Sequence, residues 1–148
     1  MDFDLISSKY SRRPKNHLVI IKIYYGLFVA DPSNQDLWCQ VETMGSKVEQ
    51  VNEKIQSAHD QSEGLPFFNF DGQSVMFNVN MRKKFNFIRF SLRDSTSLYG
   101  QRILDISDLR RGIFFSRKGY RYIPLRDGCN RQLPLGALLV HTDLIKMK

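Results

Sequence analysis

Cysteine is scarce in this chain, and the two residues present, Cys39 and Cys129, lie far apart. Two thiols at this spacing supply neither a disulfide scaffold nor a zinc site, and they are typical of a reducing compartment. No apolar run approaches the roughly 20 residues that a spanning helix needs, and the first residues lack the charged start and apolar stretch of a signal peptide. We therefore expect a cytoplasmic protein whose contact with membranes, where it has any, is peripheral.

Acidic residues are also few: 15 Asp and Glu stand against 22 Lys and Arg, for a formal net charge of +7. This balance indicates an acidic partner, either anionic lipid, nucleic acid or an acidic protein. We do not expect nucleic acid, because RNA-binding sheets expose aromatic side chains. Here the strand aromatics alternate with outward charges and so point inward, with Trp38 as the exception.

The chain has no repeat, heptad or low-complexity segment, and its 148 residues are enough for one domain. Residues 1–16 form a basic leader, which we expect to lie outside the core, and residues 17–148 form the domain. Alternation of apolar and polar residues predicts strands that bury, for example, Val19, Ile21, Ile88, Phe90 and Leu92. The clear strands are residues 17–25, 37–44, 75–79, 87–93, 101–106, 120–125 and 137–144.

Residues 45–64 are compatible with two structures. Val48, Val51, Ile55 and Ala58 are spaced like one face of a helix. A strand near residues 54–59 would instead give the neighbouring strands an edge partner, and we favour the strand. With it, the chain is predicted to be an all-β, eight-stranded antiparallel β-sandwich.

Five segments in order resemble one family, and the last of them spans residues 119–144. Residues 119–126 read Gly-Tyr-Arg-Tyr-Ile-Pro-Leu-Arg, and residues 133–140 read Leu-Pro-Leu-Gly-Ala-Leu-Leu-Val. Together with residues 36–42, 77–79, 87–92 and 100–104, they resemble the C2 domain of phosphoinositide-specific phospholipase C, most closely its β-type in the C-terminal half. The resemblance covers residues 17–144 and is weakest over residues 45–70.

This resemblance implies a C2-like sandwich packed beside a catalytic TIM barrel, which carries the family's catalytic histidines and calcium-binding carboxylates. No such barrel fits in this chain, and His17, His59 and His141 are scattered without a nucleophile. The chain by itself is therefore expected to be non-catalytic. It would act in lipid signalling as the scaffold and contact module of an enzyme that hydrolyses phosphatidylinositol 4,5-bisphosphate, or of a relative. The alternative is a protein-interaction C2 module with no lipid role.

Many C2 domains bind calcium in their apical loops, and Ca²⁺ requires six to eight oxygen ligands. Asp31 and Asp36 occupy plausible positions in the first loop. In the second loop, Arg93 and Ser95 stand where carboxylates are expected, and Asp94 would point to the opposite face. Asp31, Asp36 and Asp94 are therefore interpreted as vestigial positions, and we expect neither calcium nor another cofactor.

Four basic clusters remain, and one of them is unusual. Where the family passes directly from Arg-x-Gly to Tyr-Arg, this chain has an insertion with Ile113, Phe114 and Phe115 between Arg110, Arg111 and Arg117, Lys118. We call it the basic–apolar insertion. Together with the basic turn of Arg82, Lys83 and Lys84, it is predicted to contact an anionic membrane surface or an acidic protein face. Packing of residues 113–115 against the sandwich end or a neighbouring domain remains the alternative.

Overall fold

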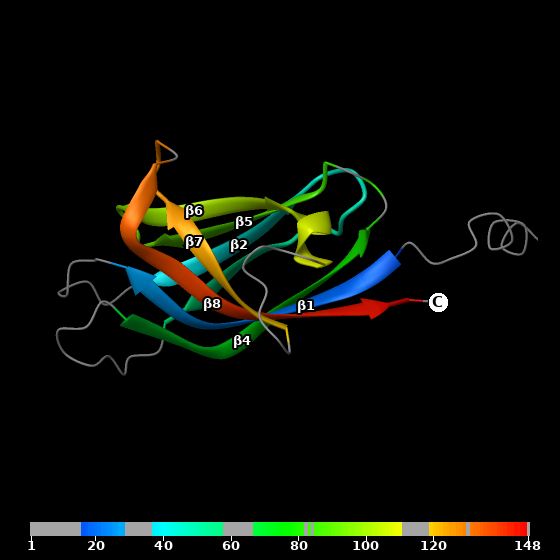
Figure 1. Ribbon diagram of the computed structural model, residues 1–148, viewed down its shortest axis with the longest axis horizontal. Helices are drawn as coiled ribbons and strands as arrows, with labels where there is room; N and C mark the ends of the chain where they lie inside the picture. The colour runs from blue at the N-terminus through cyan, green and yellow to red at the C-terminus, as the bar shows by residue number, and fades with distance from the viewer. Residues whose placement is uncertain are drawn as a thin grey trace, which may run out of the picture.

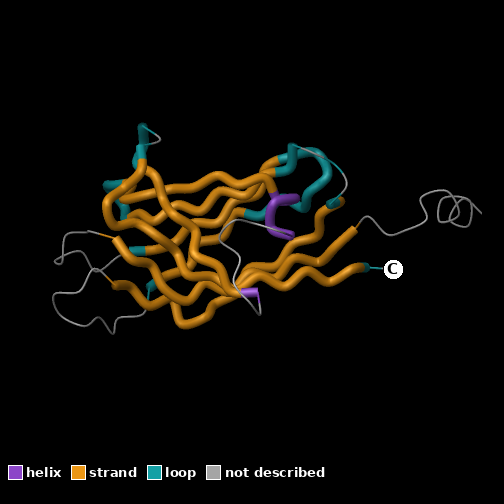
Figure 2. The backbone as a smooth tube through the Cα atoms, viewed as in Figure 1, coloured by secondary structure: helices purple, strands orange, loops and turns teal. Residues whose placement is uncertain are grey.

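The computed structural model describes residues 16–28, 37–57, 67–81, 83, 85–110, 119–129 and 131–147. The described chain forms eight strands and one 3₁₀ helix, η1 (Figures 1 and 2). In chain order the elements are β1 (Asn16–Phe28), β2 (Trp38–Met44), β3 (Asn52–Gln56), β4 (Phe67–Asn80), β5 (Phe87–Arg93), β6 (Leu98–Asp105), η1 (Ile106–Arg110), β7 (Tyr120–Arg126) and β8 (Gln132–Lys146). Over these residues, none of the helical structure is long and apolar enough to cross a membrane.

The strands form one antiparallel sheet in the order β3-β2-β5-β6-β7-β8-β1-β4. The sheet curls over its own core, so that β1, β4 and β8 lie in one layer and β2, β5 and β6 in the other (Figure 1). The two edges approach each other: Val48, before β3, bridges to Val79 in β4, and the Gln73 side chain donates a hydrogen bond to the Gln56 carbonyl, 2.9 Å away. The result is a nearly closed, C2-like β-sandwich, and the predicted fold class is confirmed.

The core consists of the inward residues that the alternation predicts. Val19, Ile21, Ile88, Phe90 and Leu92 are all fully buried. Burying one such side chain typically stabilises the fold by about 1.5–3 kcal/mol. The alternation is therefore strong enough to fix which face of each strand points inward.

The fourth strand is much longer than predicted, because it also takes in residues 67–74. Asp71 and Gly72 look like a turn in the sequence, and both do adopt left-handed φ angles of 59° and 68°. They form an irregularity within β4, opposite the register shift between Ile23 and Tyr25 of β1. Pairing with β1 continues on both sides, so the turn signal here marks a bulge and the strand does not end.

Residues 45–57 adopt the strand alternative. β3 pairs with β2 from Trp38 with Gln56 to Glu42 with Asn52, and the helix suggested by Val48, Val51 and Ile55 does not form. Instead, residues 45–51 reach across to β4, where the Asn80 N–H donates to the Lys47 carbonyl at 2.9 Å. Two further bounds were wrong: Ile106 begins η1 and is not the end of a strand, and β8 extends to Gln132–Lys146.

Candidate functional site

The first feature is the turn between β5 and β6, which contains Asp94. This side chain is 1 % exposed. Its Oδ1 accepts hydrogen bonds from the N–H groups of Thr96 and Ser97, both at 2.7 Å, and from Thr96 Oγ1 at 3.0 Å. Its Oδ2 accepts a hydrogen bond from the Tyr99 hydroxyl. The hydrogen bond from Tyr99, and then those from the turn, lower the pKa of Asp94 to about 2 despite the opposing effect of burial.

This geometry bears on calcium. A carboxylate that ligates Ca²⁺ must direct its oxygens to a shared point, whereas Asp94 Oδ1 accepts hydrogen bonds from its own turn and Oδ2 accepts one from Tyr99 in β6. Ser95 is exposed, and the Arg93 guanidinium donates from Nε to the Asp94 carbonyl at 3.4 Å. Asp31 and Asp36 lie outside the described residues. Within the described ranges, no group of three or more His, Cys, Asp or Glu could hold a metal ion.

The predicted basic contact residues are only partly described. Lys83 is exposed in the loop between β4 and β5, and Arg110 is the last residue of η1. Arg82, Lys84, Arg111, Ile113, Phe114, Phe115, Arg117 and Lys118 lie outside the described residues. The Ile106 N–H of η1 donates to the Asn86 carbonyl at 2.8 Å. The β4–β5 loop and the start of the basic–apolar insertion therefore emerge at the same end of the sandwich (Figure 1).

Asn86 organises this end of the domain, and no pattern in the sequence singles it out. Its side chain is 2 % exposed, accepts from the Lys47 N–H at 3.1 Å and donates to the Lys83 carbonyl at 3.3 Å. A Cβ at Gly45, which has a φ of 142°, would lie 2.2 Å from Asn86 Oδ1. The side-chain amide and the backbone carbonyl of Asn86 thus connect three segments: residues 45–51, residues 81–86 and η1. We call this set the end loops.

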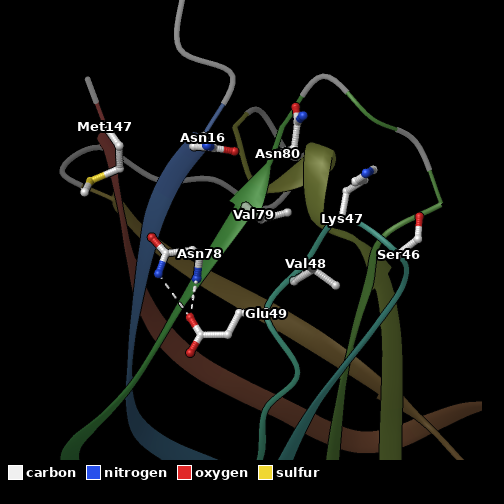
Figure 3. Close-up of a pocket in the computed structure, with 9 residues that line it drawn as sticks. All are labelled: Asn16, Ser46, Lys47, Val48, Glu49, Asn78, Val79, Asn80 and Met147. Carbon is white, nitrogen blue, oxygen red and sulfur yellow. Dashed lines mark hydrogen bonds between the residues drawn. The ribbon is translucent and has the colours of Figure 1, made fainter. Parts of the chain in front are cut away.

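A polar hollow of ≈ 560 Å³ lies beside the end loops (Figure 3). Glu49 Oε1 accepts hydrogen bonds from the N–H and the Nδ2 of Asn78, at 3.0 and 3.1 Å. The lining residues are Asn16, Ser46, Lys47, Val48, Glu49, Asn78, Val79, Asn80 and Met147. The lining thus holds one lysine, one glutamate and one serine among amides and apolar groups, and the hydrogen bonds of the glutamate, Glu49, go to Asn78.

The outer face of β4, β1, β8 and β7 carries an aromatic cluster. The Tyr120 ring packs 4.7 Å from His141 and 5.9 Å from Tyr24, measured between ring centroids. Burial, followed by the neighbouring Tyr120 and Asp143, raises the pKa of Tyr24. His141, expected to be an ordinary surface histidine, does lie on the outer face, but its side chain is only 18 % exposed, with Nδ1 3.7 Å from Asp143 Oδ2. Four exposed apolar or aromatic side chains share this face: Met76, Tyr120, Tyr122 and Ile145.

Comparison with known proteins places the fold but not the family. No family model and no curated protein sequence matches the chain. Among solved structures, PLC21 from L. pealei superposes with a TM-score of 0.62 at 20% identity, and PLC21 from S. officinalis with 0.61 at 20%. These matches cover 90% and 88% of this chain but 16% of each PLC21 chain. A C2 domain of a plant extended synaptotagmin 1 superposes with a TM-score of 0.58 at 14% identity, over 93% of this chain and 99% of that one.

These likenesses show a C2 fold. The chain spans about one sixth of the length of the PLC21 proteins it superposes on, 16% of each. At these identities the likeness concerns the fold alone, since one fold serves many functions.

Proposed function

We propose that this chain is a calcium-independent C2 module like that of phosphoinositide phospholipase C, which docks to an anionic membrane surface or an acidic protein face. It contributes no catalysis of its own. As part of a longer protein, it would sit beside a catalytic TIM barrel that hydrolyses phosphatidylinositol 4,5-bisphosphate, at the cytoplasmic side of membranes. The C2 fold, the likeness to the two PLC21 structures and the net charge of +7 support this proposal.

The observation that carries calcium independence is the closed hydrogen-bond set of Asp94. To bind Ca²⁺, this carboxylate would have to release the N–H groups of Thr96 and Ser97 and the Tyr99 hydroxyl. The Arg93 side chain beside it also adds positive charge, which opposes a cation. A site built on Asp94 would thus begin with an energetic cost that a preformed carboxylate cluster does not have.

Thermal unfolding with and without millimolar calcium tests this part of the proposal. A ligand at a hundred times its dissociation constant stabilises the folded state by about 2.7 kcal/mol. We expect an unchanged melting temperature, and flotation with phosphoinositide vesicles that is the same in calcium and in chelator. A calcium-dependent rise in melting temperature that Asp36→Asn abolishes would show that calcium binding has been retained.

The second candidate is a protein-interaction module with no lipid role, and the aromatic cluster favours it. Tyr and Met are enriched in protein interfaces, and Met76, Tyr120 and Tyr122 are exposed on one sheet face. Flotation separates the candidates. A chain that stays unbound on every anionic vesicle, while Tyr122→Ser weakens its capture of a partner protein, fits the second candidate and contradicts the first.

A further inference from the structure

The loop between β4 and β5 holds one residue in two unfavourable situations. Phe85 is 74 % exposed, and its φ of 67° lies in the left-handed region. Left-handed φ is uncommon for any residue with a side chain and is a clear outlier for a bulky one. Exposure of a phenyl ring to water is also unfavourable. Backbone outliers of this kind persist where the surroundings enforce them, and they cluster at functional positions.

The surroundings do enforce this conformation, through Asn86. Its buried side chain ties the Lys83 carbonyl on one side of Phe85 to the Lys47 N–H on the neighbouring turn. Its carbonyl is held by the Ile106 N–H of η1. Asn86 is thus held in three directions, which fixes the backbone directly after Phe85, and the Phe85 side chain projects into solvent. A Cβ at Gly45 would also lie 2.9 Å from the Phe85 carbonyl, so the backbone of the turn is closely packed as well.

Basic residues directly precede Phe85 in the sequence, where residues 82–84 read Arg-Lys-Lys. Of the described lysines of the end loops, Lys83 and Lys47 are both exposed. Glu49 is the acidic residue closest to Lys47 in the sequence, and its side chain accepts two hydrogen bonds from Asn78. An exposed phenyl ring next to a run of basic residues is the combination with which peripheral proteins enter an anionic lipid interface.

We infer that Phe85 is the apolar anchor by which the end loops dock to an anionic lipid surface, with Asn86 holding it outward. The inference rests on the membrane contact proposed above and assigns it to this end of the sandwich. A lipid surface is favoured over an acidic protein because, among the described residues of the end loops, Phe85 is the one exposed apolar side chain. A stable protein contact needs a continuous patch of about 800 Å² on each partner, whereas lipid accepts a single inserted side chain.

Co-flotation with phosphatidylcholine vesicles, with and without phosphatidylserine, tests the inference. We expect the parent chain to bind only the anionic vesicles. Phe85→Ser should weaken this binding about tenfold or more at every salt concentration, since apolar burial is not screened. Lys83→Glu should weaken it by roughly tenfold at low salt and much less at high salt. Two control variants, Ile103→Ser and Lys22→Glu, each alter an exposed side chain on another face of the domain and should leave vesicle binding unchanged.

Phe85→Gly adds a signature that a merely structural residue would not give. Glycine adopts left-handed φ without strain, so this variant should melt at the parent temperature or above it while binding vesicles as weakly as Phe85→Ser. Phe85→Trp should shift its emission to the blue on anionic vesicles, after subtraction of the parent signal from Trp38. A lower melting temperature for Phe85→Gly, or Trp emission unaffected by vesicles, would contradict the inference.

The failure of this inference can be distinguished from failure of the proposed function. If the parent binds anionic vesicles and Phe85→Ser binds equally well, the membrane contact stands and Phe85 is not its anchor. If the parent binds no vesicle, the inference and the membrane half of the proposed function are overturned. If it binds polyglutamate but no vesicle, the acidic-protein half of the proposed function stands, and the lipid assignment is again overturned.

Discussion

Replacement of Asp94 by alanine tests how strongly one carboxylate stabilises the β5–β6 turn. The substitution removes the acceptor of hydrogen bonds from the N–H groups of Thr96 and Ser97, the Thr96 hydroxyl and the Tyr99 hydroxyl. Hydrogen bonds to a charged group contribute about 1.5–3 kcal/mol each, but Thr96 and Ser97 are exposed, so water can replace the acceptor for their N–H groups. We therefore expect Asp94→Ala to lower the free energy of unfolding by about 2–3 kcal/mol at pH 7.

The pH dependence of this contribution follows from the lowered pKa of Asp94, which is about 2 in the folded chain. An unperturbed aspartate titrates near pH 3.9, at roughly the value expected of the unfolded chain. Because the folded pKa is the lower one, the ionised carboxylate stabilises the fold above the unfolded value. That stabilisation is lost as the pH falls through the range between the two values. Urea unfolding of the parent and of Asp94→Asn at pH 7, 4 and 2 measures it.

The asparagine variant keeps the shape of the side chain and one carbonyl acceptor, so we expect it to lose about 1 kcal/mol at pH 7 and less at pH 2. For a chain of this size, the alanine variant should melt about 4–10 °C below the parent. A cost below about 0.5 kcal/mol for alanine would show that the turn does not depend on Asp94. Identical pH profiles for the parent and the asparagine variant would contradict the lowered pKa.

Three further predictions concern the core, the end loops and the basic–apolar insertion. Phe90→Ala deletes a fully buried ring and should cost about 3–5 kcal/mol in urea unfolding; a cost under about 1 kcal/mol would contradict the register of β5. Gly45→Ala places a Cβ against Asn86 in a left-handed backbone and should cost more than about 2 kcal/mol, whereas Gly128→Ala, with nothing within 4 Å, should cost far less; equal melting temperatures for the two variants would contradict this. Replacing Phe114 and Phe115 by Ser should weaken vesicle or partner binding at all salt concentrations without unfolding the chain; a melting temperature many degrees lower would instead identify the pair as core.

The sequence alone determined the strands and their inward faces wherever the signal is local. Alternation from Val19 to Ile23 and from Ile88 to Leu92 has a period that only a half-buried strand satisfies, so burial follows directly from residue order. The same reasoning correctly placed Lys22 outside and Leu138 and Val140 inside. It missed residues 67–74 of β4, because the bulge at Asp71 and Gly72 interrupts the alternation there.

The tertiary structure decided the sites. Asp94 looks like a remnant of a calcium loop in the sequence, and only the fold shows the Tyr99 hydroxyl and two N–H groups converging on it. Asn86 bonds to Lys47, 39 residues away, and no local pattern predicts such a contact. The exposure of Phe85 is also visible only in the fold, because an aromatic residue after a basic run is equally compatible with a buried strand. Long-range hydrogen bonds from Asn86 to Lys47 and Ile106 fix the backbone beside Phe85, and only the tertiary structure supplies them.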